Sequence, residues 1–179
     1  METLFSTQLQ ESALLLGLFR HGPAGKPDAG EYPNDDLRPL TPKGRKIVKH
    51  SAQGLAKLGF VPTLILSSPA ERCRESAEIA RKVFGLPAKS LRTQRFLHSE
   101  FPAHQALRRL ERMKLKGRVL LVGHEPWLGE CLALLLTGRR SRSLPLRKAG
   151  FAAVALEAAA PGRGTLVTCL PPEILAALA

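Results

Sequence analysis

The feature that most constrains the fold of this chain is an apolar run that ends abruptly in charge. Residues 13–19 are apolar or small, and Arg20, His21 and Gly22 follow them directly. A run of this length is typical of a strand buried on both faces, as strands of a parallel sheet are. In open α/β sheets, the residues after such strands lie at the edge where ligands bind. The run therefore predicts a central strand with a polar site at its end.

Strand-like apolar runs alternate with amphipathic segments of helical length along the rest of the chain. This alternation favours an α/β fold of three layers, α/β/α, with a mostly parallel central sheet covered on both faces. Strands are predicted near residues 64–66, 90–93, 118–123, 151–156 and 165–170, and helices near residues 42–58, 69–84, 102–116 and 126–136. No repeat or linker divides residues 13–179, so we assign them to one domain, and we expect residues 1–12 to be a loosely structured lead-in.

One predicted helix has clear signals at both ends. Thr41 suits the N-cap and Pro42 suits the first helical position, and Gly59 is expected to end the helix. Because the cap explains Thr41 and Pro42 fully, we assign both residues to the fold rather than to the chemistry.

Composition limits the classes of protein that this chain can be. It has 179 residues, 44% of them apolar, which suits a globular domain with a sizeable core. No apolar stretch reaches the roughly 18 residues of a membrane span, and the N-terminus lacks the basic start of a secretory signal. We therefore expect a cytoplasmic protein that does not associate with membranes. Cys73, Cys131 and Cys169 form no metal-binding pattern, so reduced thiols are predicted and no metal.

The balance of charge is strongly basic. Lys and Arg outnumber Asp and Glu by 27 to 15, which gives a net charge of +12. Such a protein attracts anions, including nucleic acid, acidic proteins, phosphorylated substrates and phosphate chains. The chain has no RNA-binding motif and no zinc-finger spacing, and it has one Trp and one Tyr. These observations favour a solvated basic surface over a dedicated nucleic-acid platform.

Three predicted strand ends carry guanidinium or imidazole groups. The first ends in Arg20 and His21, the second precedes Ser67-Ser68-Pro69 and then Arg72, and the third precedes His124 at a helix start. Strand ends of a parallel sheet converge, so these groups should form one cationic pocket, to which the helix N-terminus adds partial positive charge. A guanidinium matches phosphate oxygens and an imidazole is a nucleophile near neutral pH. The sequence thus predicts a pocket that binds and transfers a phosphoryl group.

Four stretches resemble, in their order along the chain, the histidine phosphatase superfamily and its small SixA-like branch of phosphohistidine phosphatases. They are Leu18-Phe19-Arg20-His21-Gly22, Leu37-Arg38-Pro39-Leu40-Thr41-Pro42-Lys43-Gly44, Ser67-Ser68-Pro69-Ala70-Glu71-Arg72 and Val122-Gly123-His124-Glu125-Pro126. Each motif is short, but the four in this order are specific together. The resemblance extends from about residue 14 to about residue 170. It implies a phosphoglycerate mutase-like fold and a phosphatase that needs neither metal nor cofactor.

The resemblance also implies roles for individual residues. His21 would attack phosphorus and carry the phosphoryl group as a covalent phosphohistidine, which water would then hydrolyse. Arg20, Arg72 and His124 would hold the phosphoryl oxygens and neutralise charge that grows in the transition state. Gly22, Arg38 and Glu125 are assigned to substrate binding. For Arg38 two interpretations stay open, because it can pair with a carboxylate or line the mouth of the pocket.

Two further stretches receive no catalytic role. Ser67 and Ser68 are tempting nucleophiles, but no Gly-x-Ser-x-Gly elbow surrounds them. Lys148-Ala149-Gly150 resembles a stretch that precedes a late strand in the SixA-like branch, and a structural role is expected for it.

The general acid is the weakest part of the pattern. Many relatives use a carboxylate to protonate an alcohol leaving group. The corresponding region here, about residues 96–104, offers only Glu100, and Glu125 is a second candidate. A protonated imidazole leaves far more easily than an alkoxide, so the lack of a clear acid favours phosphohistidine over sugar phosphates. The chain also lacks long insertions, which predicts a shallow pocket open to a protein surface.

These observations predict a monomeric phosphatase whose partner is a protein that carries phosphohistidine. Two alternatives stay open. The same pocket could hydrolyse small phosphomonoesters or polyphosphate, since the positive charge suits an extended polyanion. A non-catalytic module that binds phosphate or nucleic acid is the other, although the intact set of Arg20, His21, Arg72 and His124 argues against it.

Overall fold

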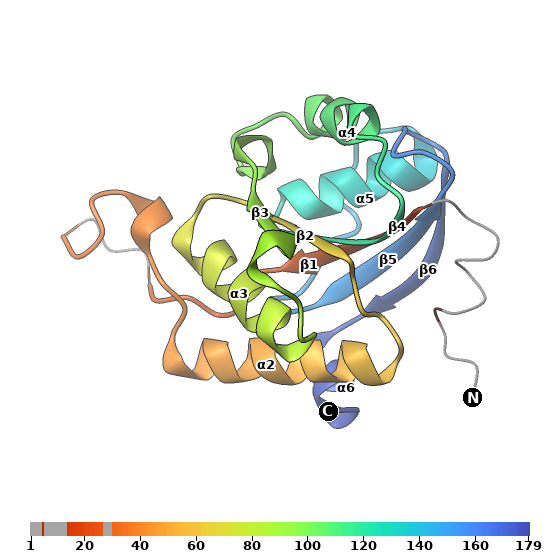
Figure 1. Ribbon diagram of the computed structural model, residues 1–179. Helices are drawn as coiled ribbons and strands as arrows, with labels where there is room; N and C mark the ends of the chain where they lie inside the picture. The colour runs from red at the N-terminus through yellow and green to blue at the C-terminus, as the bar shows by residue number, and fades with distance from the viewer. Residues whose placement is uncertain (1–4, 6–13, 27–29) are drawn as a thin grey trace.

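The computed structural model describes residues 5, 14–26 and 30–179, whose strands form one six-stranded sheet (Figure 1). The strands are β1 (Leu14–Arg20), β2 (Leu64–Ser67), β3 (Leu91–Thr93), β4 (Gly117–Gly123), β5 (Phe151–Leu156) and β6 (Gly164–Leu170). Their order across the sheet is β3-β2-β4-β1-β5-β6. Strands β1 to β4 pair in parallel, whereas β5 pairs antiparallel with β1 and β6 pairs antiparallel with β5. The predicted mostly parallel sheet is confirmed, and β5 alone of these six strands runs in the opposite direction.

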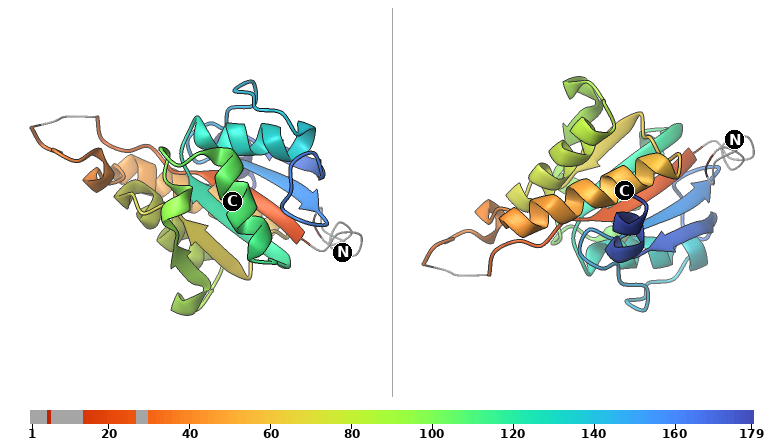
Figure 2. Two further views of the ribbon diagram at one scale, coloured as in Figure 1. Left: turned by 90° about the horizontal axis from the view of Figure 1, so that it is seen from above. Right: turned by 90° about the horizontal axis from the view of Figure 1, so that it is seen from below.

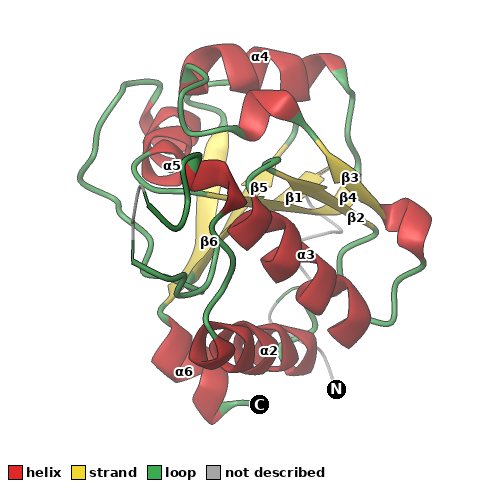
Figure 3. Ribbon diagram, turned by 90° about the vertical axis from the view of Figure 1, so that its left-hand side faces the viewer, coloured by secondary structure: helices red, strands yellow, loops and turns green. Residues whose placement is uncertain are grey.

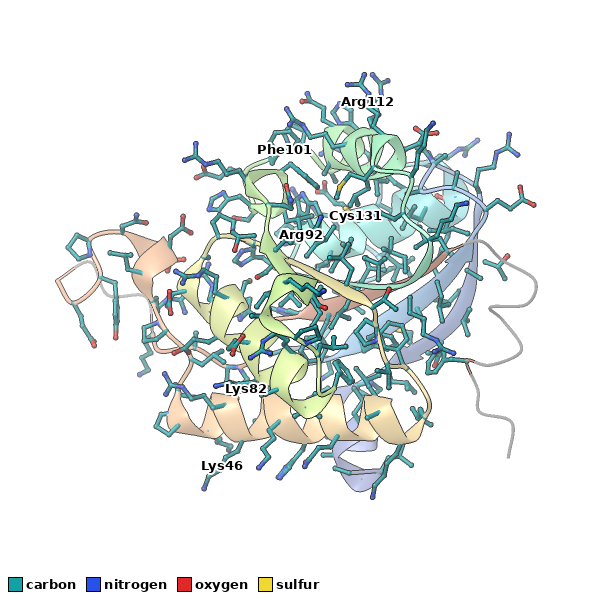
Figure 4. All side chains as sticks on the ribbon, viewed as in Figure 1. Lys46, Lys82, Arg92, Phe101, Arg112 and Cys131 are labelled. Atoms are coloured by element: carbon teal, nitrogen blue, oxygen red, sulfur yellow. The ribbon has the colours of Figure 1, made fainter. Side chains whose placement is uncertain are left out.

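Helices cover both faces of this sheet, as the alternating pattern predicts (Figures 1 and 3). They are α2 (Pro42–Lys57), α3 (Glu71–Val83), α4 (Ala103–Arg112), α5 (Trp127–Thr137) and α6 (Pro172–Ala177), with short 3-10 turns at Asp35–Leu37, Ala88–Ser90 and Arg95–Leu97. Helices α2, α3 and α6 lie on one face, and α4 and α5 lie on the other. Exposed Lys46 on α2 and Arg112 on α4 extend away from the sheet on opposite sides (Figure 4).

Strand β1 is buried on both faces because its apolar residues alternate between two cores. Leu16 and Leu18 pack on the side of α4 and α5, and Leu15 and Phe19 pack on the side of α2 and α3. Gly17 between them leaves room for two aromatic rings, since a Cβ at this position would lie 2.6 Å from Phe60. The fully apolar run at residues 13–19 therefore indicates a central strand rather than a strand with one face exposed to solvent.

Phe5 belongs to the predicted lead-in, but its ring is buried. It meets the rings of Phe60 and Phe151 edge-on, with centroids 5.4 and 6.3 Å away. One aromatic side chain of the predicted lead-in thus completes the core on the side of β1 that faces α2 and α3. The other residues of the predicted lead-in lie outside the described residues.

The signals at the ends of α2 are confirmed. The Thr41 hydroxyl accepts a hydrogen bond from the backbone N–H of Gly44 (2.9 Å), and Pro42 occupies the first helical position. Gly59 follows the helix with a φ of 88°, which glycine adopts without strain.

Two helices differ from the sequence prediction. Helix α4 ends at Arg112 rather than near residue 116, because Lys114 adopts a left-handed φ of 48° as the chain turns towards β4. Helix α6 was not predicted at all. Its six residues span fewer than two turns, too few for an apolar periodicity to be recognised.

Helix α6 packs directly on α2, and the view from below shows the two side by side (Figure 2). The contact needs Gly54, since a Cβ there would lie only 2.0 Å from the carbonyl oxygen of Leu175. A close approach of two backbones is the reason for glycine in the interior of an otherwise regular helix. Gly54 therefore sets the position of α6 against the rest of the fold.

We expect Gly54→Ala to lower the free energy of unfolding by about 1–3 kcal/mol, because the new methyl group forces α6 away from α2. Urea unfolding of the variant and the wild type measures this difference. Gly25→Ala is the matched control, since a Cβ at Gly25 meets nothing within 4 Å. Equal losses in the two variants would contradict this explanation of Gly54.

Candidate active site

The predicted convergence of strand ends is confirmed by backbone hydrogen bonds. The N–H of His21, just after β1, donates to the carbonyl of Gly123 at the end of β4 (3.0 Å). The N–H of Ser68, just after β2, donates to the carbonyl of Val122 (2.9 Å). Because His124 follows Gly123 directly, the two histidines and Ser68 meet at one edge of the sheet.

A cavity of about 390 Å³ lies at this edge. It is lined by Arg20, His21, Ala24, Gly25, Lys26, Arg38, Arg72, Ser99, His124, Glu125 and Lys148. The lining includes all the predicted site residues except Gly22 and Glu100. Its charged members are five cations and one carboxylate, so the cavity attracts anions. We call it the phosphoryl cavity, after the group that the sequence predicts for it.

His21 is buried and neutral in this cavity. Its side chain has 7% of its surface exposed, and Nδ1 lies 2.7 Å from the carbonyl oxygen of Gly22. A carbonyl oxygen only accepts hydrogen bonds, so Nδ1 carries the proton. Burial, and then the cations of Arg72, Arg20 and Lys148, lower the pKa of His21 to about 3. The ring therefore has a free lone pair on Nε2 at neutral pH, as a nucleophile requires.

Gly22 packs closely against α2. A Cβ at this position would lie 2.5 Å from Val48 and 3.0 Å from the carbonyl oxygen of Gly44. Its N–H donates to the hydroxyl of Ser76 (3.2 Å). These contacts let the loop after β1 lie against α2, and the substrate-binding role of Gly22 stays a prediction.

Asp35 holds two arginines of the cavity in place. One of its carboxylate oxygens pairs with Nη2 of Arg72 (2.9 Å) and the other with Nε of Arg38 (2.8 Å). Its backbone carbonyl accepts a second hydrogen bond from Arg72, whose exposed fraction is only 6%. Arg38 also donates to the carbonyl of Gly25 (2.6 Å). Both open interpretations of Arg38 are therefore correct, since it pairs with a carboxylate and also lines the pocket.

Arg20 and Arg72 retain buried donors. Nη1 of Arg20 donates to the carbonyl of Leu146 (2.8 Å), and burial lowers the pKa of this guanidinium while Glu125 raises it. The Nε atoms of Arg20 and Arg72 are buried and have no hydrogen-bond partner in the part of the chain that the structure describes. An unpaired buried donor is costly in free energy. The cavity thus holds the guanidiniums of Arg20 and Arg72 in a state that an added acceptor would stabilise.

His124 is also buried and neutral. Its exposed fraction is 3%, and its ring lies edge-on to that of His21 with centroids 5.4 Å apart. Burial, followed by His21, Arg72 and His98, lowers its pKa to about 3. A neutral imidazole has one N–H and one lone pair, so the partner of each ring nitrogen decides what His124 can offer a ligand.

Ser68 is the partner of one His124 ring nitrogen. Its hydroxyl lies 2.8 Å from Nε2, and the thiol of Cys73 lies 3.4 Å from the same atom. When the hydroxyl donates to Nε2, the ring proton resides on Nδ1. Ser68 is therefore placed to determine the tautomer of His124, a role that the sequence analysis missed because it depends on a contact across 56 residues.

Glu125 lines the phosphoryl cavity, whereas Glu100 does not. One oxygen of Glu125 accepts the N–H of Leu146 (2.9 Å). Burial raises the pKa of this carboxyl, although the bond from Leu146 and a backbone hydrogen bond from Gly129 lower it. The Glu100 side chain is 88% exposed and lines a separate depression beside His98. The structure does not bring the predicted acid Glu100 together with His21.

The stretch around Lys148 combines two roles. The N–H of Ala149 donates to the carbonyls of Arg20 and His21 (both 3.1 Å), which supports the predicted structural role. Lys148 also lines the phosphoryl cavity, and the sequence analysis did not assign it there. Lys26 and Asp35 were missed as well, since neither belongs to a pattern that links them to the strand ends.

The remaining predictions concern thiols, metals and membranes. Cys73 and Cys131 are buried free thiols, and Cys169 is exposed. Among the described residues, no group of His, Cys, Asp and Glu side chains could hold a metal ion. No helix in the described ranges has the length and apolarity needed to cross a membrane.

Comparison with known proteins supports the predicted resemblance. Residues 16–95 match the family model of the histidine phosphatase superfamily (branch 1). An uncharacterized protein of Picosynechococcus sp. is 36% identical over 138 residues, which cover 76% of this chain and 81% of that protein. The fold is similar to that of the protein histidine phosphatase SixA complexed with tungstate, with a TM-score of 0.76, 24% identity and coverage of 88% of this chain and 97% of that one.

A second similar structure is the putative phosphohistidine phosphatase SixA from Agrobacterium tumefaciens. Its TM-score is 0.72 at 23% identity, with coverage of 88% of this chain and 97% of that one. These likenesses confirm the predicted phosphoglycerate mutase-like fold.

The two neutral histidines predict that stability falls in mild acid. Their pKa is about 3 in the folded protein against an ordinary 6.5, so the unfolded chain binds more protons between these values. The contribution is complete above pH 6.5 and is lost towards pH 3, by up to about 1.4 kcal/mol per pH unit for each histidine. Urea unfolding across this range measures the slope. We expect His21→Asn and His124→Asn each to make it shallower, whereas His50→Asn, on the exposed side of α2, leaves it unchanged. Equal slopes in all four proteins would overturn the assignment.

Proposed function

The chain belongs to the histidine phosphatase superfamily (branch 1) and is a hydrolase that acts on phosphoryl groups, and from this premise we propose that it is a metal-independent phosphatase of protein phosphohistidine. The observation that carries the proposal is the buried, neutral His21 with a free Nε2 among the cations of the phosphoryl cavity. A neutral nucleophile surrounded by fixed positive charge suits attack on a dianionic phosphoryl group.

In the proposed first step, the lone pair on Nε2 of His21 attacks phosphorus. A bond forms between Nε2 and phosphorus while the bond between phosphorus and the substrate imidazole breaks. The substrate ring is already protonated on its other nitrogen, so it takes the electron pair of the broken bond and departs as neutral imidazole. The hydrogen bond from Nδ1 to the Gly22 carbonyl keeps the ring in the reactive tautomer and stabilises the positive charge that it gains. Water then attacks the phosphohistidine, which releases inorganic phosphate and restores neutral His21.

Arg20 and Arg72 would bind the phosphoryl oxygens during both steps. Their buried Nε donors lack a partner within the described ranges, and an oxyanion would supply one. Asp35 orients Arg72 in advance, so little reorganisation is needed when charge develops in the transition state. His124 would add a donor if its proton resides on Nδ1, the tautomer that the Ser68 hydroxyl selects by donating to Nε2.

The carboxylates of the site favour phosphohistidine as the substrate. Leu146 and Gly129 engage the carboxylate of Glu125, and Glu100 lies outside the cavity. Glu125 is thus the one carboxyl in the described lining that could protonate an alkoxide, as an ester substrate would require, and backbone donors already engage it. The protonated imidazole of phosphohistidine is a better leaving group than an alkoxide and depends less on a general acid. SixA, which is similar in fold, binds tungstate, a tetrahedral oxyanion like a phosphoryl group.

A second candidate function is hydrolysis of small phosphomonoesters or polyphosphate in the same cavity. The five cations of the lining and the net charge of +12 favour it, since both attract extended polyanions. A preference for long phosphate chains that weakens steeply with salt would identify this activity. A module that only binds phosphate has no use for a histidine held neutral with a free lone pair, so we place it third.

We expect the wild-type protein to release phosphate from a phosphohistidine protein in the presence of EDTA, and His21→Ala to lose at least about a thousandfold in kcat. An aryl phosphate is assayed in parallel, and His50→Ala is the matched control on an exposed histidine. Loss of wild-type activity in EDTA would contradict the metal-independent mechanism. Activity on the aryl phosphate alone would move the substrate to phosphomonoesters.

We expect Ser68→Ala to lower kcat about tenfold to a hundredfold with little change in KM, because His124 loses the partner that selects its tautomer. Ser68→Thr retains the hydroxyl and should restore most of kcat. Ser67→Ala is the control, since that buried hydroxyl donates to the Ser68 carbonyl (2.9 Å) and makes no hydrogen bond to His124 among the described residues. An equal loss in Ser67→Ala and Ser68→Ala, with no recovery in Ser68→Thr, would show that packing alone is affected.

A further inference from the structure

A second cavity, of about 470 Å³, adjoins the phosphoryl cavity. It is lined by Arg20, Pro23, Ile47, Arg147, Lys148, Pro172, Glu173 and Ala176, and we call it the flank cavity. Arg20 and Lys148 line both cavities, so a ligand in one reaches the edge of the other. The size is within the range of small-ligand sites, and the mechanism proposed above does not use this space.

The wall of the flank cavity suits an apolar group. Pro23, Ile47, Pro172 and Ala176 provide it, and the ion pair between Arg147 and Glu173 (3.0 Å) stands at its rim. Prolines and aliphatic side chains offer no donors to a phosphate, whereas burial of a ligand's apolar surface against them is favourable. The flank cavity therefore differs in chemistry from the phosphoryl cavity next to it.

The two walls of the flank cavity come from elements that are fixed to each other. Ile47 lies on α2, and Pro172 and Ala176 lie on α6, which runs beside α2 (Figure 2). The close backbone contact at Gly54 holds α6 in this place. A cavity between two packed helices is preformed, so a ligand does not have to order it.

Charge around the two cavities limits what can occupy them together. Among the described residues, their combined lining contains the cations of Arg20, Lys26, Arg38, Arg72, Arg147 and Lys148 and the carboxylates of Glu125 and Glu173. A protein segment with acidic residues complements this surface, and electrostatic complementarity speeds association and excludes basic partners. An inorganic phosphate chain is also anionic, but it has no apolar group to place against Ile47.

We propose that the flank cavity binds an apolar side chain next to the phosphorylated histidine of an acidic substrate segment. The proposal rests on the proposed function, because it places the phosphohistidine itself in the phosphoryl cavity. It makes the flank cavity the part of the site that distinguishes one phosphoprotein from another. Binding energy gained there is independent of the phosphoryl group.

The test compares kcat/KM for phosphohistidine peptides that carry Leu or Ser next to the phosphohistidine in the same acidic background. N-phosphoimidazole, which has no flanking residue, reports on the phosphoryl cavity alone. We expect the wild type to favour the Leu peptide about tenfold, as one buried apolar group typically provides. Ala176→Trp fills the cavity and should abolish this preference while N-phosphoimidazole turnover stays within about twofold. Ala177→Trp, on an exposed neighbour outside the cavity, should retain the preference.

Ile47→Ser is a second variant, which removes part of the apolar wall without adding bulk and should weaken the preference in the same direction. Equal turnover of the Leu and Ser peptides by the wild type would overturn the inference and leave the proposed function intact. The inference would also be overturned if Ala176→Trp lowered polyphosphate hydrolysis while its preference for the Leu peptide stayed unchanged. If the wild type hydrolyses neither N-phosphoimidazole nor a peptide, the proposed function fails and this inference with it.

Discussion

The parallel pairing of β1 with β4 is the constraint on which the site depends. Arg20 lies opposite Gly123 in this register, and the hydrogen bond from His21 to the Gly123 carbonyl extends the pairing one residue beyond the strand. The two histidines therefore emerge side by side from neighbouring strands. A shift of the register by one residue would exchange the faces of every β1 side chain, so the apolar residues that fill both cores also hold the site in place.

The site brings several positive charges together, which repel one another and lower the stability of the folded state. Few carboxylates among the described residues offset this repulsion. Asp35 pairs with both Arg38 and Arg72, and Glu125 partly offsets Arg20. His21 and His124 avoid adding charge because burial and the nearby cations keep them neutral. A pocket with unpaired positive charge and neutral imidazoles is poorly stabilised by itself, yet it is well matched to a dianion, and such local conflicts are expected at functional sites.

The sequence predicts the parts of the site that follow strand ends, and it misses the parts that depend on side-chain direction. Arg20, His21, Arg72 and His124 are recognisable because apolar runs locate the strands that carry them, and their convergence follows from parallel topology. Ser68 and Asp35 are missed in their roles, since each acts through a tertiary contact that no local pattern encodes. The packing of Gly22 against α2 is likewise not predicted, because this close approach depends on the tertiary structure.

The described lining of the phosphoryl cavity holds a single carboxyl, already engaged by a backbone donor, and this scarcity of acids also bears on specificity. A phosphoryl cavity contacts the group that all phosphorylated substrates share, so it contributes little to the choice among phosphoproteins. The imidazole of phosphohistidine is a good leaving group. In the proposed mechanism, the phosphoryl cavity alone would therefore allow the protein to hydrolyse any phosphohistidine exposed on a protein surface. Discrimination must then come from contacts outside the phosphoryl cavity, which raise kcat/KM only for substrates able to make them. The flank cavity, preformed between α2 and α6 and joined to the phosphoryl cavity by Arg20 and Lys148, is positioned to provide such contacts.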